Sequence, residues 1–147
     1  MIRYLPYALG IFAGFGLSVQ VGMNSQLRRT LQSANTAALI SFLVGTAGLI
    51  LLLLVTRTGA PSRDTLASVP LWAWFGGLLG AFYVASSTVV ASQLGTTSLL
   101  ALALLGQLAT ALVLDHFGWL GLPENPITLT RLGGVGLLGA GVWLITR

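Results

Sequence analysis

The chain has 147 residues, of which 55% are hydrophobic and only 7% carry a charge, and its mean hydropathy is +0.90. This composition excludes an ordinary soluble domain and is typical of an integral membrane protein. All seven basic residues are arginines scattered between apolar runs, whereas nucleic-acid binders cluster theirs on one face, so we expect no binding to nucleic acid. The chain has no cysteine, which excludes disulfides, thiol redox chemistry and thiolate metal sites.

Five stretches of the sequence are long and apolar enough to cross a membrane as helices. A bilayer core of about 30 Å takes roughly 20 apolar residues in a helix, with about 17 to 25 tolerated. The five stretches are residues 5–23, 37–55, 71–91, 98–114 and 129–146. No small-residue cleavage site closes the first, so we interpret it as a membrane span and not as a secretory signal. The sequence therefore predicts a single all-α integral membrane domain over residues 1–147, with about five transmembrane helices.

The connectors between these spans are short. Residues 24–36 carry amide and arginine side chains around two leucines, which suits an amphipathic turn at the membrane interface, with Asn35 or Thr36 capping the second helix. Residues 56–70 contain glycine and proline, which are typical of loops. Residues 93–97 leave room only for a tight turn, so we expect the third and fourth helices to form an antiparallel hairpin.

The arginines carry almost no information about orientation in the membrane. With five spans the termini lie on opposite sides, and four arginines then face three: Arg3, Arg57, Arg63 and Arg131 against Arg28, Arg29 and Arg147. Orientation normally follows an excess of basic residues in cytoplasmic loops, so this near balance predicts insertion in both orientations. Two oppositely oriented copies would form a ten-helix unit of the inverted-repeat kind that many secondary transporters contain. We therefore expect an antiparallel homodimer.

Glycines recur at four-residue spacing on several of the predicted helices. Gly10 and Gly14 form such a pair in the first span, Gly76 and Gly80 form another in the third, and residues 133–141 contain five glycines. In lipid, helices associate through small residues that let their backbones approach closely. We interpret these glycines as packing positions; for residues 133–141 a hinge for alternating access is the alternative.

Polar side chains inside a membrane span are costly and therefore informative. The candidates for substrate contact are Gln20, Asn24, Tyr83, Ser87, Gln107 and Asp115. Gln20 and Asn24 are four residues apart and so share a helix face, as do Tyr83 and Ser87, whereas Gln107 lies near the middle of the fourth span. Each also has a structural alternative, as a helix cap, a packing contact or a single interhelical hydrogen bond.

Asp115 is the one carboxylate that begins inside an apolar run, and His116 follows it. The pair fits either a solvated helix end or a site for a proton or cation. No span has an acid at its middle, no nucleophile is paired with a base, and one histidine alone cannot hold a metal. We therefore expect no enzyme activity, no cofactor and no metal.

Several elements together resemble the short bacterial YdcZ-like family of the drug/metabolite transporter superfamily. The similar runs are Gln20-Val-Gly-Met-Asn24 with Arg28, Ala38 to Gly45, Gly76 to Tyr83, Gly106-Gln107, Asp115-His-Phe-Gly118 and Arg131-Leu-Gly-Gly. This resemblance covers nearly the whole chain. It implies a five-helix half-transporter that occurs as dual-topology homodimers, as paired oppositely oriented subunits or as fused ten-helix chains.

The small multidrug resistance proteins of the same superfamily use a glutamate in their first helix to exchange protons for cations. The first span here has Gln20 and Asn24 and no acid, which argues against proton-coupled cation export.

Our hypothesis is a subunit of a secondary-type transporter, multi-pass in the bacterial inner membrane, that moves a small polar metabolite or organic solute by alternating access. Neutral amide, hydroxyl and phenol groups near the two-fold axis suit hydrogen bonding to such a solute. The expected partners are the lipid bilayer, a second copy and an unknown small-molecule substrate. The alternatives are an accessory or scaffold subunit without transport of its own, a passive channel, and half of a heterodimeric transporter. A scaffold predicts that Gln107 and Tyr83 tolerate apolar replacement, and a channel needs a continuous water-lined path.

Overall fold

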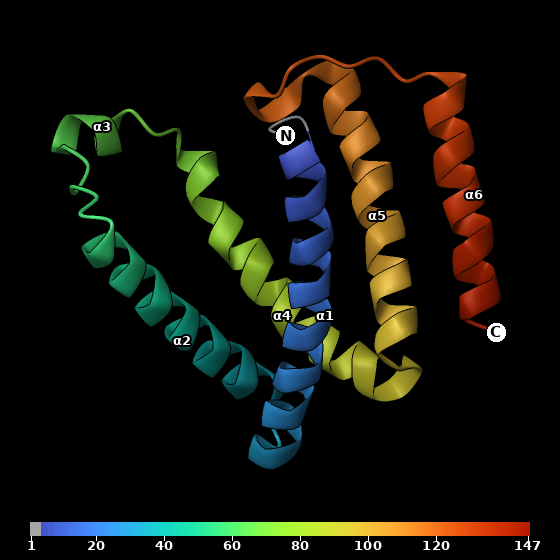
Figure 1. Cartoon of the computed structure of the whole chain (residues 1–147), viewed down its shortest axis with the longest axis horizontal. Helices are drawn as coiled ribbons and strands as arrows, with labels where there is room; N and C mark the ends of the chain where they lie inside the picture. The colour runs from blue at the N-terminus through green and yellow to red at the C-terminus, as the bar shows by residue number, and fades with distance from the viewer. Residues whose placement is uncertain (1–3) are drawn as a thin grey trace. The chain divides into compact units, whose positions relative to one another are not determined.

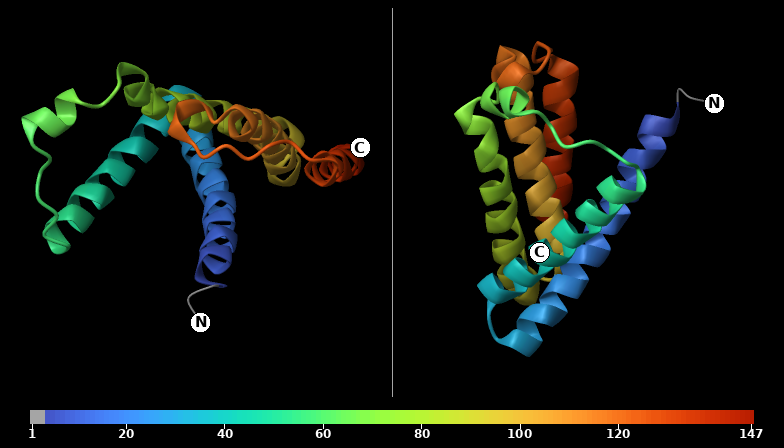
Figure 2. Two further views of the ribbon diagram at one scale, coloured as in Figure 1. Left: turned by 90° about the horizontal axis from the view of Figure 1, so that it is seen from above. Right: turned by 90° about the vertical axis from the view of Figure 1, so that its left-hand side faces the viewer.

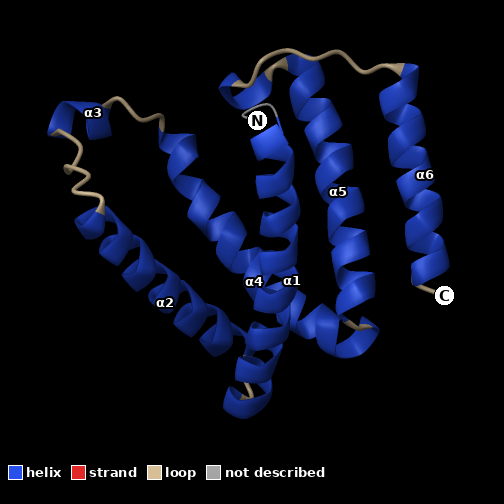
Figure 3. Cartoon of the chain, in the orientation of Figure 1, coloured by secondary structure: helices blue, strands red, loops and turns tan. Residues whose placement is uncertain are grey.

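The computed structural model describes residues 4–147, so Arg3 of the charge balance lies outside the described residues. Within that range the chain forms six α-helices joined by short loops (Figures 1 and 3). They are α1 Leu5–Leu31, α2 Ala34–Val55, α3 Arg63–Ala67, α4 Gly76–Leu94, α5 Thr96–Phe117 and α6 Leu129–Ile145. Short 3₁₀ turns at Leu71–Phe75 and Trp119–Gly121 lead into α4 and follow α5.

The predicted all-α membrane fold is confirmed. Among residues 4–147, four helical segments are long and apolar enough to cross a membrane: Leu5–Leu31, Ala34–Val55, Leu71–Leu94 and Thr96–Phe117. The fifth predicted span corresponds to α6, which has 17 residues and therefore stands at the lower end of the length that a bilayer core requires. The ten-helix dimer stays a prediction.

The first helix is longer than predicted. α1 continues to Leu31, and only Gln32 and Ser33 separate it from α2, so the prediction of a separate interfacial turn over residues 24–36 was wrong. The reason is that residues 24–31 contain neither glycine nor proline, and the arginines in the last turn interact favourably with the negative end of the helix dipole. Gln32 then ends the helix with a left-handed backbone, at φ 53°.

The helix caps also differ from the prediction. Ser33, not Asn35 or Thr36, caps α2, because its Oγ accepts a hydrogen bond from the Thr36 N–H at 3.2 Å. Ser62 caps α3 in the same way, and the connector predicted as a loop thus contains a five-residue helix.

The tight connection between the third and fourth spans is confirmed, since only Gly95, with φ +82°, separates α4 from α5. Their antiparallel packing stays a prediction.

The chain divides into two compact units, Met1–Val89 and Val90–Arg147, with the boundary inside α4. In the first unit, α1 and α2 diverge from their short junction (Figure 1, and the left view of Figure 2). Small or slender residues of three helices are shielded from solvent in this unit: Val21, Asn24 and Ser25 of α1, Ala37 and Ala38 of α2, and Val84, Ser87 and Thr88 of α4. Their size lets the helix backbones approach closely.

One predicted packing glycine is used within the first unit. A Cβ on Gly80 of α4 would stand 3.3 Å from Cζ of Phe42 on α2, so the absence of a side chain there allows the phenyl ring to pack against α4. Gly10, Gly14 and Gly76 have nothing within 4 Å of the equivalent position. These three glycines therefore do not serve packing among the described residues.

In the second unit, α5 and α6 run side by side (Figures 1 and 2). Gly139 of α6 faces Leu105 of α5, whose Cδ1 would stand 3.9 Å from a Cβ on the glycine. The other α6 glycines, at positions 133, 134, 136 and 141, have no neighbour within 4 Å. Most of the predicted packing positions on α6 are thus unoccupied within the second unit.

Most large apolar side chains point away from the interior of the chain. Every residue of α2 from 49 to 54 is exposed, and Leu129 and Leu137 of α6 are exposed as well. In a bilayer this surface faces acyl chains, while the helices satisfy their own backbone hydrogen bonds. The protein interior stays small because the lipid supplies the remaining apolar surroundings.

Candidate functional site

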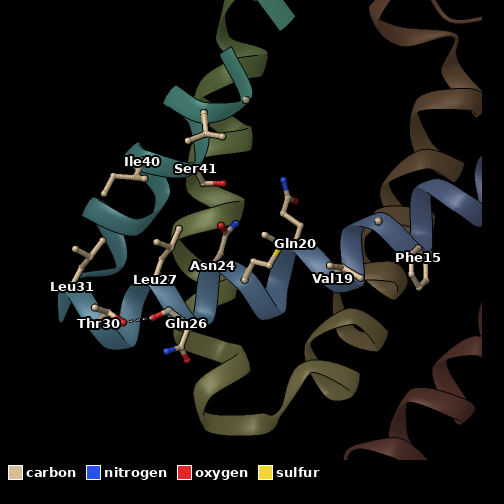
Figure 4. A pocket seen from close by; sticks show the side chains of 14 residues that line it. Phe15, Val19, Gln20, Asn24, Gln26, Leu27, Thr30, Leu31, Ile40 and Ser41 are labelled. Atoms are coloured by element: carbon tan, nitrogen blue, oxygen red, sulfur yellow. Dashed lines mark hydrogen bonds between the residues drawn. The ribbon is translucent and has the colours of Figure 1, made fainter. Parts of the chain in front are cut away.

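A groove of about 860 Å³ lies between α1 and α2 in the first unit (Figure 4). Ten of its lining residues come from α1, between Phe15 and Leu31, and four come from α2: Ile40, Ser41, Val44 and Gly45. Sites for small organic molecules typically have volumes of about 300–1,000 Å³. The groove therefore has the size of a small-molecule site.

The groove runs along α1 from Leu31, at the end of the helix, to Phe15, and Gln20 lies within it at about the middle of a membrane. Gln20 precedes Leu31 by eleven residues, which corresponds to about 16 Å along a helix. The arginines at 28 and 29 suit the interface, and the hydrocarbon core is about 30 Å thick. A solute hydrogen-bonded to Gln20 would thus lie at roughly half the depth of the core.

Three polar side chains meet in this groove. Gln20 and Asn24 project from the same side of α1 toward α2, as their four-residue spacing requires, and Ser41 of α2 lies beside them (Figure 4). Asn24 is only 4% exposed. Within residues 4–147, none of the three side chains makes a hydrogen bond. Asn24 is the buried one of the three, whereas Gln20 is exposed and Ser41 is half-buried, and all three keep hydrogen-bonding groups that are available to a solute.

Gln26 and Thr30 of α1 also line the groove (Figure 4), and the Thr30 hydroxyl donates to the Gln26 carbonyl oxygen at 3.2 Å. None of the fourteen lining residues is charged. The groove therefore combines apolar walls with neutral hydrogen-bonding groups.

Tyr83 and Ser87, predicted to share a face of the third span, do not line this groove. Ser87 is 2% exposed, and its hydroxyl donates to the Val84 carbonyl oxygen at 2.9 Å, so its own helix satisfies it. The Tyr83 hydroxyl and the Ser25 Oγ are shielded from solvent and have no partner among residues 4–147. Tyr83 thus retains an unused hydrogen-bonding group, and Ser87 does not.

Gln107 lies on α5 in the second unit, and its side chain is exposed. It makes no hydrogen bond with any other described residue, so the interhelical bond considered from the sequence does not form inside residues 4–147.

Asp115 is part of an ordered junction between α5 and α6. Arg131 Nη2 lies 2.5 Å from Asp115 Oδ2, and both side chains are 30% exposed. Arg131 Nη1 also donates to the carbonyl oxygen of Asn125 at 2.7 Å, and the Asn125 N–H donates to the Asp115 carbonyl oxygen at 2.8 Å. The carboxylate is therefore paired with a guanidinium and does not stand alone as a cation site.

The residue beside it supports the same junction. His116 Nδ1 accepts a hydrogen bond from the Ile127 N–H at 3.3 Å, and its ring meets Phe117 edge to face. Gly118 ends α5 with a left-handed backbone at φ +60°. Asp115 and His116 thus hold the connector between α5 and α6 against the end of α5.

Sequence reasoning missed two members of these sites. Ser41 was overlooked although it is a hydroxyl in an otherwise apolar stretch, and that contrast was the available signal. Arg131 was used for topology and for the family resemblance but was not considered as a partner of Asp115. An acid at the end of one span and an arginine at the start of the next indicate a pair when the spans are neighbours.

Comparison with known proteins agrees with this architecture. A family model described as "Putative inner membrane exporter, YdcZ" matches residues 5–144. The chain is 31% identical over 147 residues to the "Inner membrane protein YdcZ" of Escherichia coli (strain K12), covering 100% of this chain and 98% of that protein. No solved structure matches the chain significantly. The description of this family is that of a membrane transporter-like protein and not of an enzyme, and the chain is a multi-pass protein of the bacterial inner membrane. The chain therefore belongs to the YdcZ family.

Proposed function

We propose that the protein is a five-helix subunit of a secondary-type exporter, which works as an antiparallel homodimer and moves a small polar metabolite or organic solute by alternating access. The observation that carries this proposal is the groove between α1 and α2, which places unpartnered Gln20 and Asn24 inside a span. Polar groups in hydrocarbon are costly, and function is a common reason for keeping them there.

The depth of the groove supports alternating access. In a single copy the stretch of groove from Leu31 to Gln20 corresponds to about half the hydrocarbon thickness. In an antiparallel pair, one groove would open toward each side of the membrane. A rocking motion of one copy against the other would then expose a central solute to the two sides in turn.

Two features support a second copy as the partner. The balance of four arginines against three favours insertion in both orientations. Four α6 glycines, Gly133, Gly134, Gly136 and Gly141, have no neighbour within 4 Å in the second unit, and such positions suit close contact with another helix.

The candidate residues take different roles in this proposal. Gln20 and Asn24 contact the solute. Tyr83 and Gln107 have no partner in the described chain and provide further contacts in the dimer. Ser87 aids the close approach of the helices, and Asp115 acts as a positioning residue through Arg131.

The topology test comes first, because the antiparallel dimer depends on it. Single cysteines replace Ala60 and Thr146, which lie on opposite sides in a five-span chain, and both substitutions leave all arginines in place. Labelling with a membrane-impermeant thiol reagent from each side of the membrane should modify each site from both sides. The cysteine-free parent chain is the background control. Labelling of each site from one side only would exclude the homodimer and point to a partner of opposite orientation.

A further inference from the structure

We infer that the α1–α2 groove binds an uncharged amphipathic organic solute, held by its hydrogen-bonding end at Gln20, Asn24 and Ser41 and by its apolar body against walls such as Phe15 and Val44. This inference rests on the proposed function for the location of the site, and it adds the chemical class of the solute.

The absence of charge in the lining carries the first step. The three acids of the chain are Asp64, Asp115 and Glu124, and none of them lines the groove. No arginine lines it either. A charged solute in hydrocarbon surroundings requires a charged partner or its own water, because an unpaired ion there is costly. The groove has no charged side chain that could pair with a cationic or an anionic solute.

The second step is the unused hydrogen-bonding capacity of the groove. Asn24 is more than nine-tenths buried, and its amide lies within the groove without a partner among residues 4–147 (Figure 4). Two carboxamides and a hydroxyl supply both donors and acceptors. They match a neutral solute with amide, hydroxyl or carbonyl groups better than they match a plain hydrocarbon chain.

The apolar walls supply the third step. Phe15 and Val19 lie on one side of the polar group along α1, and Leu27 and Leu31 lie on the other, with Ile40 facing from α2. Apolar walls with a few well-placed polar groups are typical of small-molecule sites. A fully polar solute would leave these walls unused, so the solute is amphipathic.

The test uses the full chain in lipid nanodiscs. A Val44→Cys variant places a thiol in the groove, and a Leu51→Cys variant places one on an exposed part of the same helix outside it. The rate of alkylation by N-ethylmaleimide is measured with increasing concentrations of three probes of similar size: uncharged N-benzylacetamide, cationic benzyltrimethylammonium and anionic phenylacetate.

We expect N-benzylacetamide to slow alkylation of the Val44→Cys thiol severalfold while the Leu51→Cys thiol reacts unchanged. The charged probes should protect at higher concentrations or not at all. Adding Asn24→Leu should raise the half-protecting concentration of N-benzylacetamide by about tenfold, because a hydrogen bond in a desolvated site is lost. Ser41→Ala should raise it by a smaller factor and serves if Asn24→Leu does not fold. Ser18→Ala is the matched control, since this hydroxyl bonds to Gly14 O outside the groove.

Equal protection by all three probes would overturn the inference about charge, and protection by none would overturn the site. Cross-linking of the Val44→Cys thiols of two copies by a short bis-maleimide would assign the groove to the second copy and also overturn it. Each of these results is distinct from a failure of the proposed function, because the two-sided labelling of Ala60→Cys and Thr146→Cys involves no ligand.

Discussion

Loss of the ion pair between Asp115 and Arg131 should weaken the attachment of α6 to α5. The guanidinium joins three segments, since it contacts the Asp115 carboxylate at 2.5 Å and the Asn125 carbonyl oxygen at 2.7 Å. Asp115→Asn removes the charge at nearly constant volume, and Arg131→Gln removes the guanidinium. Each variant leaves the other partner incompletely compensated.

The expected size of the effect follows from the exposure of the pair. A hydrogen bond to a charged group contributes about 1.5–3 kcal/mol, whereas a fully exposed ion pair contributes about 0–1 kcal/mol. Both side chains are 30% exposed, so solvent screens the pair only in part. We expect a coupling energy of about 1–2 kcal/mol, which corresponds to a change of roughly five- to thirtyfold in the unfolding equilibrium.

A double-mutant cycle measures this coupling directly. Asp115→Asn, Arg131→Gln and the double variant are unfolded by SDS in mixed micelles, with tryptophan fluorescence as the signal. Arg63→Gln, at an exposed arginine outside the junction, is the control. A coupling energy within about 0.3 kcal/mol of zero would refute the reasoning. Full stability of Asp115→Asn together with lost transport would instead assign Asp115 to the solute path.

Three further predictions concern the helix ends and α6. Ser33→Ala should lower the free energy of unfolding by about 1 kcal/mol, because the N-cap bond to the Thr36 N–H is lost; an unchanged SDS midpoint would contradict this. Gly118→Ala should lower the free energy of unfolding by about 1–2 kcal/mol, because φ is +60° and a Cβ would fall 2.7 Å from Glu124 Cγ. Gly136→Ala in the same titration is the control and should be nearly neutral. Gly136→Ile should weaken self-association, because nothing in the second unit fills the space at this position and a large side chain would keep another helix away. Energy transfer between labelled copies in liposomes measures the association, and an unchanged signal would place α6 outside the interface.

The helical spans were predictable because hydropathy is a property of local sequence. In lipid every backbone polar group must be satisfied within its own segment, so a long apolar stretch has essentially one structure available. The start of α2 and the extent of α1 were harder to predict. Polar residues such as Asn24 and Ser25 indicated a connector, yet they are buried inside the first unit. A polar side chain that faces another helix and one that faces water look the same in a sequence.

The candidate site was only partly predictable for a similar reason. The four-residue spacing of Gln20 and Asn24 put both on one face, and the structure places that face along the groove. Ser41 joins them from α2, and Arg131 joins Asp115 across sixteen residues of sequence. Those partners come from other helices, and helical periodicity reports only which residues share a face of one helix.

Composition and hydropathy by themselves determined that this is an integral membrane protein, that it is all helical, and where its apolar helices lie. The near balance of the arginines, also visible in the sequence, led to the dual-topology hypothesis. Only the tertiary structure decided that Asp115 is neutralised by Arg131, that the Ser87 hydroxyl is used by its own helix, and that Asn24 stays unpartnered in a groove. Burial and hydrogen bonding depend on which faces of different helices meet, and helix packing in lipid is set by shape and by small residues whose pairing the sequence does not specify.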